Sequence, residues 1–193
     1  MNARRGRGGS GSSILAVPLM VVAGAAVIAV ASRAGASRAD AGLCPARPAG
    51  VSATGATIDG QPLSGAQIGN ARLIYDVAAG MRLPGRAAVI GIATAMQESR
   101  LENIPYGTAD SLGLFQQRPS YGWGTPAEIM RPGSAATAFY DRLLQVPGWR
   151  ALPLTVAAQD VQRSAYPDAY AQWEPLATDM ATAFSACDAG SRR

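Results

Sequence analysis

An uncharged apolar run near the N-terminus decides where the rest of this 193-residue chain can fold. The run covers residues 14–31, ILAVPLMVVAGAAVIAVA, and follows Arg4, Arg5 and Arg7. As a helix with a rise of about 1.5 Å per residue it would span roughly 27 Å, close to the hydrocarbon thickness of a bilayer. We therefore expect a single membrane anchor or a long signal peptide, with a helix buried in the domain core as the third alternative. In the first two cases everything after residue 36 is extracytoplasmic, either membrane-anchored or secreted.

The chain divides into three segments by composition. We predict an anchor or signal over residues 1–36, a flexible linker over residues 37–63 and one folded domain over residues 64–187. The linker is rich in Ala, Gly, Ser and Pro and has no apolar period, which is typical of a tether. The net charge of +4 belongs to the N-terminus, because 12 arginines balance 12 acidic residues over residues 44–193. The folded domain therefore has no electrostatic reason to bind nucleic acid.

The two cysteines of the chain agree with export. Cys44 and Cys187 lie near the two ends of the folded region, and in an exported chain one disulfide between them is expected. Such a long loop would stabilise the fold by about 4 to 5 kcal/mol in the chain-entropy model. A lipid on Cys44 is the alternative, although Leu43 occupies the position where a lipobox has a small residue.

The composition excludes several kinds of active site. The chain has no histidine, whereas Ser/His/Asp and Cys/His sites need an imidazole and zinc sites need several His or Cys ligands. We therefore expect no metal, no cofactor and chemistry that depends on a carboxylate. Only four glutamates are available, and they are Glu98, Glu102, Glu128 and Glu174.

Apolar periodicity predicts a mostly helical domain of the α+β class. Four glycines and two prolines within residues 100–124 exclude a helix there, and we expect a loop with a short β-hairpin beside the active site. Thr125 and Pro126 are expected to begin a short helix. The longer helices are expected over residues 64–80, 83–99, 134–146, 155–164 and 168–186.

Glu98 is the candidate acid. It follows AAVIGIATAM, residues 87–96, a stretch that is apolar nearly all round and is therefore predicted to be a buried helix. Burial and the negative end of the helix macrodipole would both raise the pKa of Glu98. A glutamate that stays protonated near neutral pH can act as a general acid. The alternative is a carboxylate at a solvated helix end, paired with Arg100.

Two sequence motifs resemble those of a known family. MQESRLEN around Glu98 and SLGLFQQRPS from Ser111 are similar to the two leading motifs of the lysozyme-like lytic transglycosylases: a glutamate–serine pair at a helix end and a Gly-Leu-x-Gln hairpin. The continuation RPSYGWGTPAEI resembles the variant found in exported cell-wall proteins of actinobacteria. The resemblance covers residues 64–186 and implies a lysozyme-like fold.

The resemblance also implies a reaction and a substrate. Glu98 would protonate the glycosidic oxygen between N-acetylmuramic acid and N-acetylglucosamine in peptidoglycan, and would later take a proton from the 6-hydroxyl of the sugar. This intramolecular nucleophile replaces the second carboxylate of ordinary glycosidases and leaves a 1,6-anhydro product. The implied substrate-binding residues are Ser99, Gly113, Leu114, Phe115, Gln116, Gln117, Tyr121, Gln162 and Tyr170.

Within the hairpin motif, each residue type has a physical role. Gly113 permits close approach of the backbone, Leu114 or Phe115 packs against the helix that bears Glu98, and Gln116 offers its amide to an N-acetyl group. A purely structural turn is the alternative interpretation.

The third motif of the family is replaced here by AAQDVQRSAYPDAY. Gln162 is expected in the role of the usual asparagine, and Tyr170 in that of a late tyrosine that hydrogen-bonds near the acid or packs in the core.

The aromatic residues fall into two groups. Tyr106, Tyr121 and Trp123 lie in the irregular stretch after the acid, where they either stack on sugar rings or pack under the loop. Trp149 and Trp173 are expected in the core.

Two other functions stay open. A hydrolytic muramidase would need a base for water, and Asp110 and Glu102 are the nearby carboxylates. A catalytically silent glycan-binding or assembly module is the other, favoured by the divergent third motif. The expected partner is the glycan strand of peptidoglycan in every case, and the oligomeric state is left open.

Overall fold

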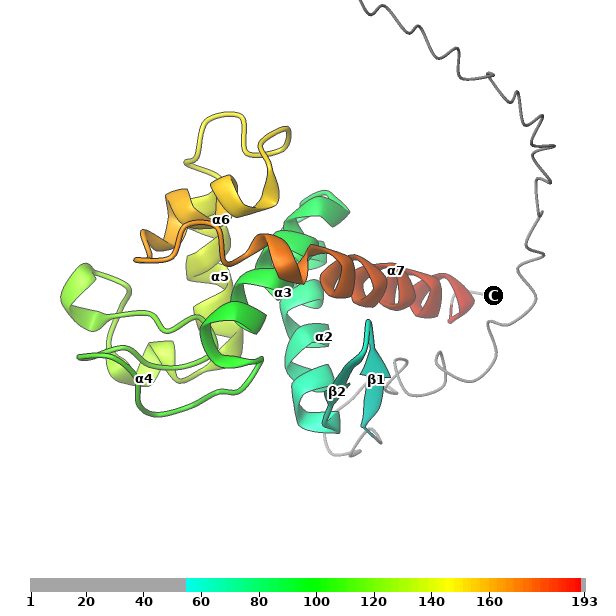
Figure 1. The fold of residues 1–193 in the computed structure, drawn as a ribbon, viewed down its shortest axis with the longest axis horizontal. Coiled ribbons are helices and arrows are strands. Elements are labelled where there is room, and N and C mark those ends of the chain that lie inside the picture. Colours follow the sequence, from blue (N-terminus) through cyan, green and yellow to red (C-terminus); the bar gives the residue numbers. More distant parts are fainter. Residues whose placement is uncertain (1–54, 192–193) are drawn as a thin grey trace, which may run out of the picture. The chain divides into compact units, whose positions relative to one another are not determined.

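The structure is a computed structural model that describes residues 55–191 (Figure 1). These residues form a mostly helical domain with one small antiparallel sheet, which confirms the predicted mixture of many helices and few strands. The elements in order are β1 (Ala56–Ile58), β2 (Gln61–Leu63), α2 (Gly65–Gly80), α3 (Gly85–Ser99), η1 (Pro119–Tyr121), α4 (Pro126–Ile129), α5 (Pro132–Leu143), α6 (Leu154–Gln162), η2 (Ala171–Trp173) and α7 (Glu174–Gly190).

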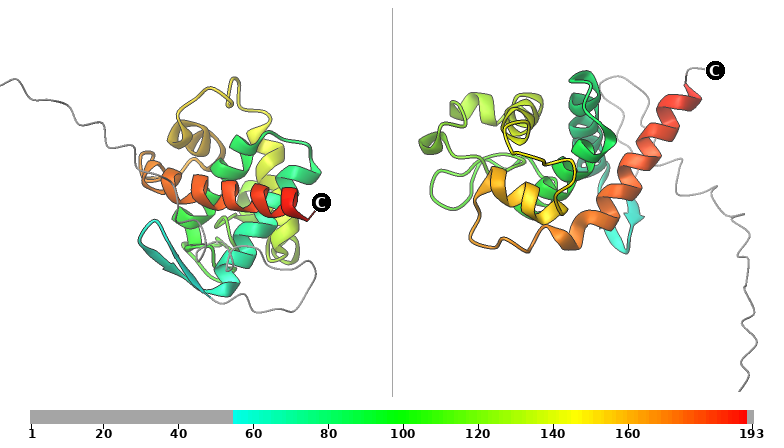
Figure 2. Two further views of the ribbon diagram at one scale, coloured as in Figure 1. Left: turned by 90° about the vertical axis from the view of Figure 1, so that its right-hand side faces the viewer. Right: turned by 90° about the horizontal axis from the view of Figure 1, so that it is seen from above.

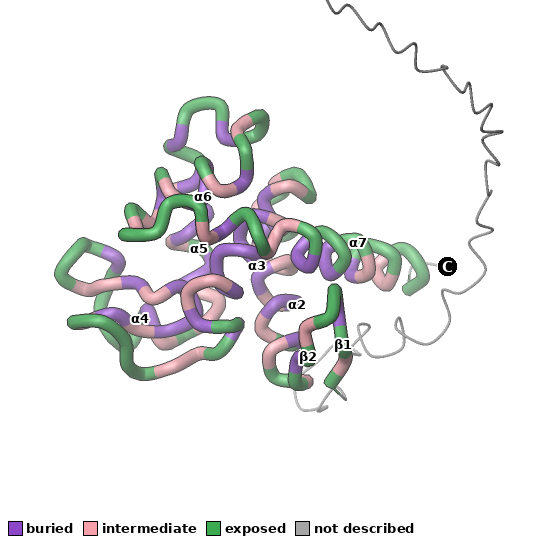
Figure 3. The backbone as a smooth tube through the Cα atoms, viewed as in Figure 1, coloured by how far each residue is buried: buried purple, intermediate pink, exposed green. Residues whose placement is uncertain are grey.

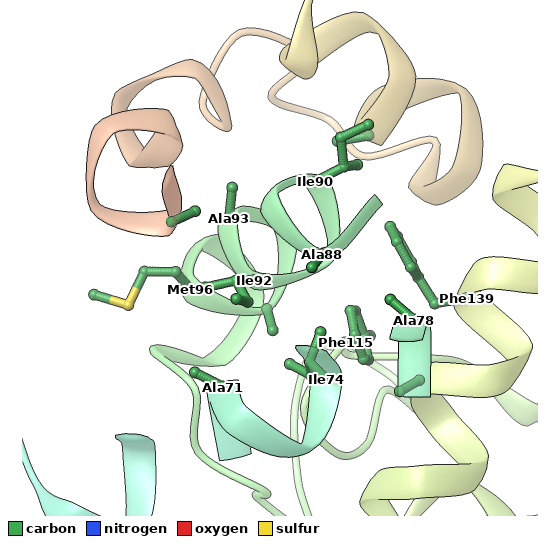
Figure 4. Close-up of a cluster of buried hydrophobic side chains, with 14 of the residues drawn as sticks. Ala71, Ile74, Ala78, Ala88, Ile90, Ile92, Ala93, Met96, Phe115 and Phe139 are labelled. Atoms are coloured by element: carbon green, nitrogen blue, oxygen red, sulfur yellow. The ribbon is translucent and has the colours of Figure 1, made fainter. Parts of the chain in front are cut away.

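Helix α3 passes through the middle of the domain. It packs against α2, α5, α6 and α7 (Figure 1) and is buried along most of its length (Figure 3). Its side chains meet those of α2 and α5 in one apolar cluster, which Figure 4 shows around Ile74, Ile92 and Phe139. This burial confirms the prediction that residues 87–96 form a buried helix. A helix that is apolar on all sides is stable when neighbouring elements cover all of its sides.

Close packing requires a glycine in α3. A side chain at Gly91 would collide with the hydroxyl of Tyr140, which donates a hydrogen bond of 3.1 Å to the carbonyl oxygen of Ile74. Because Gly91 has no side chain, Tyr140 of α5 can pass beside α3 and hydrogen-bond to the backbone of α2.

Capping residues explain where two helices begin. Ser64 accepts from the backbone of Gln67 and the side chain of Gln67 accepts from Ser64, which is a capping box for α2. Thr125 and Glu128 form the same box at the start of α4. Both starts agree with the sequence prediction.

The sheet is a hairpin at the N-terminal edge of the described residues, beside α7 (Figure 2). Ala56 pairs with Leu63, and Asp59 and Gly60 connect the strands with φ of 46° and 71°. Asp-Gly with positive φ at both positions is the two-residue turn favoured in hairpins. The structure differs here from the linker predicted over residues 37–63, because this turn and the strand pairing order its last part.

The hairpin predicted within residues 100–124 is reduced to a single bridge. Leu112 and Gln117 exchange backbone hydrogen bonds of 2.9 and 3.0 Å and form an isolated antiparallel pair. Pro119 has no N–H and cannot extend the ladder, and the side chain of Asp110 binds the opposite segment instead. The prediction of paired strands beside Glu98 is therefore wrong, and the segment is a tight turn in a long loop.

Several predictions fall on residues outside the described part of the chain. These are the anchor or signal over residues 1–36, most of the linker, and Cys44. Cys187 in α7 is disulfide-bonded, and its predicted partner, Cys44, is the only other cysteine of the chain. Between residues 55 and 191, no helix has the length and apolarity needed to cross a membrane.

Candidate active site

Glu98 stands where α3 ends abruptly. Arg100 and Leu101 both adopt positive φ, 58° and 62°, and their backbone N–H groups donate to the carbonyl oxygens of Met96 and Ala95. Left-handed residues of this kind close the last turn and redirect the chain. The chain therefore changes direction directly after the turn that bears Glu98.

Two side chains of α2 hold this helix end in place. Gln67 Nε2 donates to the carbonyl oxygen of Arg100 at 2.7 Å, and Asn70 Nδ2 donates to that of Leu101 at 2.8 Å. These bonds satisfy carbonyl groups that the helix itself leaves open, so the position of Glu98 is fixed by neighbouring structure.

The Glu98 carboxyl is held by two polar side chains. Tyr170 donates its hydroxyl proton to Glu98 Oε1 at 2.7 Å, and the Gln162 amide also hydrogen-bonds the carboxyl. Burial raises the pKa of Glu98 and outweighs the two hydrogen bonds, which lower the pKa because they stabilise the charged form. The net shift is upward, as the sequence predicts for a general acid.

Tyr170 is fully buried and acts as a donor to the acid. Burial raises the pKa of its hydroxyl, and the charge of Glu98 raises it further. The Tyr170 hydroxyl therefore stays protonated at neutral pH and remains a hydrogen-bond donor to the Glu98 carboxyl. Both interpretations from the sequence apply, because the ring lies in the core and the hydroxyl lies in the site.

We name residues 162–170 the tyrosine segment and residues 112–117 the motif turn. Gln162 joins the two, because its Nε2 donates to the carbonyl oxygen of Phe115 at 2.8 Å. The same amide thus contacts the acid and the motif turn.

Ser99 fastens the motif turn to α3. Its buried hydroxyl lies 2.8 Å from the carbonyl oxygen of Leu114 and 3.2 Å from that of Ala95. The hydroxyl is therefore occupied within the protein, and Ser99 positions the turn instead of presenting a free group to a substrate.

Gly113 needs its lack of a side chain. Its φ is +74°, and a Cβ there would come within 2.9 Å of the carbonyl oxygen of Ile129. The predicted close approach of backbone is confirmed, with the last residue of α4 as the partner.

Three residues assigned to substrate binding are core residues. Leu114 and Phe115 are fully buried, and Phe115 stacks on Phe139 with ring centroids 4.7 Å apart. Gln117 is also buried, and its Nε2 donates to the carbonyl oxygen of Ala135 at 3.0 Å. These side chains hold the turn against α3 and α5, and they have no open surface for a ligand.

Gln116 is partly exposed but already bonded. Its Nε2 donates to the carbonyl oxygens of Tyr106 and Gly113 at 3.2 and 3.3 Å. Both bonds are long, so exchange for an N-acetyl oxygen would cost less than for ideal bonds.

Asp110, the first alternative base, is engaged elsewhere. Its carboxylate accepts from Arg118 Nε at 2.5 Å and from the backbone N–H and the hydroxyl of Ser120 at 2.8 and 3.0 Å. Arg118 and Ser120 hold the pKa of Asp110 well below its usual range. Glu102, the second alternative, is exposed.

Over residues 55–191, no group of three potential metal-ligating side chains is found.

A cleft opens beside Gln162. Its volume is about 400 Å³. Tyr121 is largely exposed at 65%, whereas Trp123 is buried against Arg142, whose guanidinium lies 3.5 Å from the centre of the indole. The lining residues are Tyr121, Trp123, Arg142, Val161, Gln162 and Arg163.

Sequence reasoning missed the two arginines of this cleft. Arg142 follows Tyr121 by 21 residues, yet it donates to the Tyr121 carbonyl oxygen at 3.1 Å. Arg163 directly follows Gln162, and adjacency to a candidate residue was the one signal available for it. Of the other aromatic residues, Tyr106 is exposed outside this lining and Trp149 is buried as predicted.

Comparison with known proteins does not identify a family. No family model matches the chain, and no curated protein matches it. A function therefore has to be inferred from the geometry around Glu98 and from the motifs.

Proposed function

We propose that this protein is a lytic transglycosylase with a lysozyme-like domain, which cleaves peptidoglycan strands between N-acetylmuramic acid and N-acetylglucosamine. The observation that carries the proposal is the environment of Glu98. Its carboxyl has a raised pKa and accepts a hydrogen bond of 2.7 Å from Tyr170. Gln162, which also bonds this carboxyl, lines an open cleft. The motifs MQESRLEN and SLGLFQQRPS support the same conclusion.

In the first step Glu98 acts as a general acid. In a protonated carboxyl the carbonyl oxygen is the stronger hydrogen-bond acceptor, so the bond from Tyr170 to Oε1 favours the form with the proton on Oε2. This proton goes to the glycosidic oxygen as the bond to C1 of the muramyl residue breaks, and the electron pair leaves with that oxygen.

In the second step the same residue acts as a base. The Glu98 carboxylate accepts the proton of the muramyl 6-hydroxyl while O6 bonds to C1, which closes the 1,6-anhydro ring and restores the acid. The hydrogen bonds from Tyr170 and Gln162 favour the carboxylate, whereas burial favours the acid. Their opposition keeps both forms accessible during one turnover.

The proposed reaction needs no second carboxylate. An intramolecular hydroxyl replaces water as the nucleophile and is already held near C1. The occupied state of Asp110, bonded to Arg118 and Ser120, agrees with this.

We propose an extracytoplasmic location, with residues 14–31 as an anchor or a signal. The disulfide-bonded state of Cys187 supports an oxidising compartment, and peptidoglycan lies on that side of the membrane.

The test is incubation of the full-length protein with purified sacculi, followed by mass spectrometry of the product ends. We expect 1,6-anhydromuramic ends. Reducing muramic ends would identify a hydrolytic muramidase, and no soluble product would favour a silent glycan-binding module.

A further inference from the structure

Two arginines line the cleft beside Gln162 without a carboxylate partner. Arg142 comes from α5, and Arg163 directly follows α6. Among the described residues, neither forms an ion pair. Their charges act on each other, since burial lowers the pKa of Arg142 and the charge of Arg163 lowers it further. The cleft therefore holds positive charge that the protein does not neutralise.

Arg142 is fixed before any ligand arrives. Its Nη2 donates to the carbonyl oxygens of Tyr121 and Gly122 at 3.1 and 3.0 Å, and its guanidinium lies over the ring of Trp123. A guanidinium offers five donors, so these contacts leave others available. A cation held this way loses little conformational entropy when it binds an anion.

Arg163 is exposed and free to complete the pair. Its φ of 54° ends α6, with its backbone N–H bonded to the carbonyl oxygen of Gln159 at 2.7 Å. Its side chain forms no hydrogen bond to any residue between 55 and 191. An adjoining hollow, which the two arginines also line, includes Asp160, but the part of the cleft at Gln162 has no acidic residue in its lining.

We propose that Arg142 and Arg163 form a carboxylate-binding subsite for the acidic side chain of the muramyl residue. The inference rests on the proposed function. Gln162 contacts the Glu98 carboxyl and precedes Arg163 in the chain, so the arginines lie close to the sugar whose C1 is attacked. Of the two sugars in the strand, the muramyl residue alone bears an acid, either as a free lactyl carboxylate or on the attached peptide. Arginine suits such a group, because its planar fork binds a carboxylate through two bonds.

The test compares Arg163→Gln with a matched control. Arg82→Gln is suitable, because Arg82 is also an exposed arginine with positive φ, 57°, just after a helix, and it is not in the cleft lining. Full-length proteins are assayed on natural strands and on strands whose carboxyl groups have been converted to methylamides. Arg142 is left unchanged, because its loss would also free the carbonyl groups of Tyr121 and Gly122.

We expect Arg163→Gln to raise KM on natural strands about tenfold with kcat unchanged. On methylamide strands the variant and the wild type should have the same KM, and Arg82→Gln should match the wild type on both. On strands stripped of peptide the lactyl carboxylate is the one acid left on the muramyl residue: a retained Arg163 effect shows that the subsite accepts the lactyl group, and a lost effect assigns the effect on natural strands to the carboxylates of the peptide. An unchanged KM on natural strands, with turnover intact, would overturn the subsite and leave the proposed function standing.

A binding measurement keeps the inference testable if no cleavage occurs. The affinity of a peptide-bearing muramyl disaccharide for the Glu98→Gln protein is measured by calorimetry, with and without Arg163→Gln. An affinity loss of about tenfold on Arg163→Gln supports the subsite, whether or not sacculi are cleaved. Absence of cleavage together with this loss would count against the proposed function and not against the subsite. Equal affinities, or no binding to either protein, would overturn the subsite.

Discussion

The motif turn and the tyrosine segment both reach the end of α3, yet they serve Glu98 in different ways. The motif turn resembles a family motif, but its side chains are largely used inside the protein: Phe115 stacks on Phe139, and the Leu114 carbonyl oxygen accepts from Ser99. The tyrosine segment departs from the family pattern, yet it supplies the two side chains that bond the acid, Gln162 and Tyr170.

This difference separates two requirements of a catalytic carboxyl. The helix end must be held still, and the motif turn does this by packing against α3 and α5. The carboxyl must also be tuned, and the tyrosine segment does this with two donors that oppose burial. Substitutions in the motif turn should therefore change stability, whereas substitutions in the tyrosine segment should change rate and pH dependence.

The largest expected effect is on Glu98 itself. Glu98→Gln keeps the shape of the side chain but cannot donate the proton, so kcat should fall by about 10² to 10⁴. Turnover of sacculi and thermal unfolding are measured together. Glu102→Gln, the same substitution at an exposed glutamate, is the control and should retain wild-type activity. Full activity of Glu98→Gln would remove Glu98 from the reaction.

Truncation in the motif turn should act on stability. Phe115→Ala removes a fully buried ring that stacks on Phe139, and the resulting cavity should lower the free energy of unfolding by about 3 to 5 kcal/mol. Denaturant titration measures this loss. Tyr121→Ala removes an exposed ring of similar size and should change stability by less than about 0.5 kcal/mol. Equal losses for the two variants would contradict the structural role of the turn.

In the tyrosine segment, Tyr170→Phe should change both rate and pH dependence. The variant lacks the hydroxyl that bonds Glu98 Oε1, and we expect kcat to fall about tenfold. That bond lowers the pKa of Glu98, so its loss raises the pKa and the acid form persists to higher pH. Activity declines as Glu98 loses its proton, so the alkaline limb of the pH profile of kcat/KM should move to higher pH. A shift to lower pH, or none, would contradict the assignment.

Ser99→Ala is expected to have the smallest effect on the rate of cleavage. The variant loses the hydroxyl that bonds the Leu114 carbonyl oxygen at 2.8 Å, which should cost about 1 to 3 kcal/mol of stability because a buried acceptor loses its donor. The rate of cleavage below the melting temperature should stay within a few-fold of wild type. A large fall in kcat at unchanged stability would instead give Ser99 a direct role in the reaction.

Local signals in the sequence predicted that the helices exist, but the helix expected over residues 168–186 begins only at Glu174, where Pro175 fits the first turn, and ends at Gly190. The capping boxes at Ser64 and Thr125 depend on residues three positions apart, so sequence alone is sufficient to find them. The burial of α3 follows from its apolar residues in the same way. The hairpin at Asp59 and Gly60 was missed because its strands are only three residues long and lie in a segment whose composition is that of a linker.

Site residues could be predicted from the sequence only where they lie in a motif that resembles a known one. Tyr170 and Glu98 are 72 positions apart, and nothing in their spacing indicates the contact, so their pairing depended on the family resemblance. Arg142 lies in α5 and Arg163 directly follows α6, neither belongs to a motif, and their proximity arises from the packing of α5 on α6. The same resemblance assigned Gln117 to the substrate, although its side chain points into the core, because a motif does not distinguish support from contact.

The central claim is that one carboxyl, Glu98, cleaves the strand with the 6-hydroxyl of the sugar as nucleophile. Cleavage of sacculi in water enriched in the heavy oxygen isotope tests this most directly, since only hydrolysis places a solvent oxygen on the new muramyl end. We predict anhydro ends without heavy oxygen as the main product of the wild type, and their loss in Glu98→Gln. Reducing ends that contain heavy oxygen as the main product would contradict the claim and would require a second group that activates water.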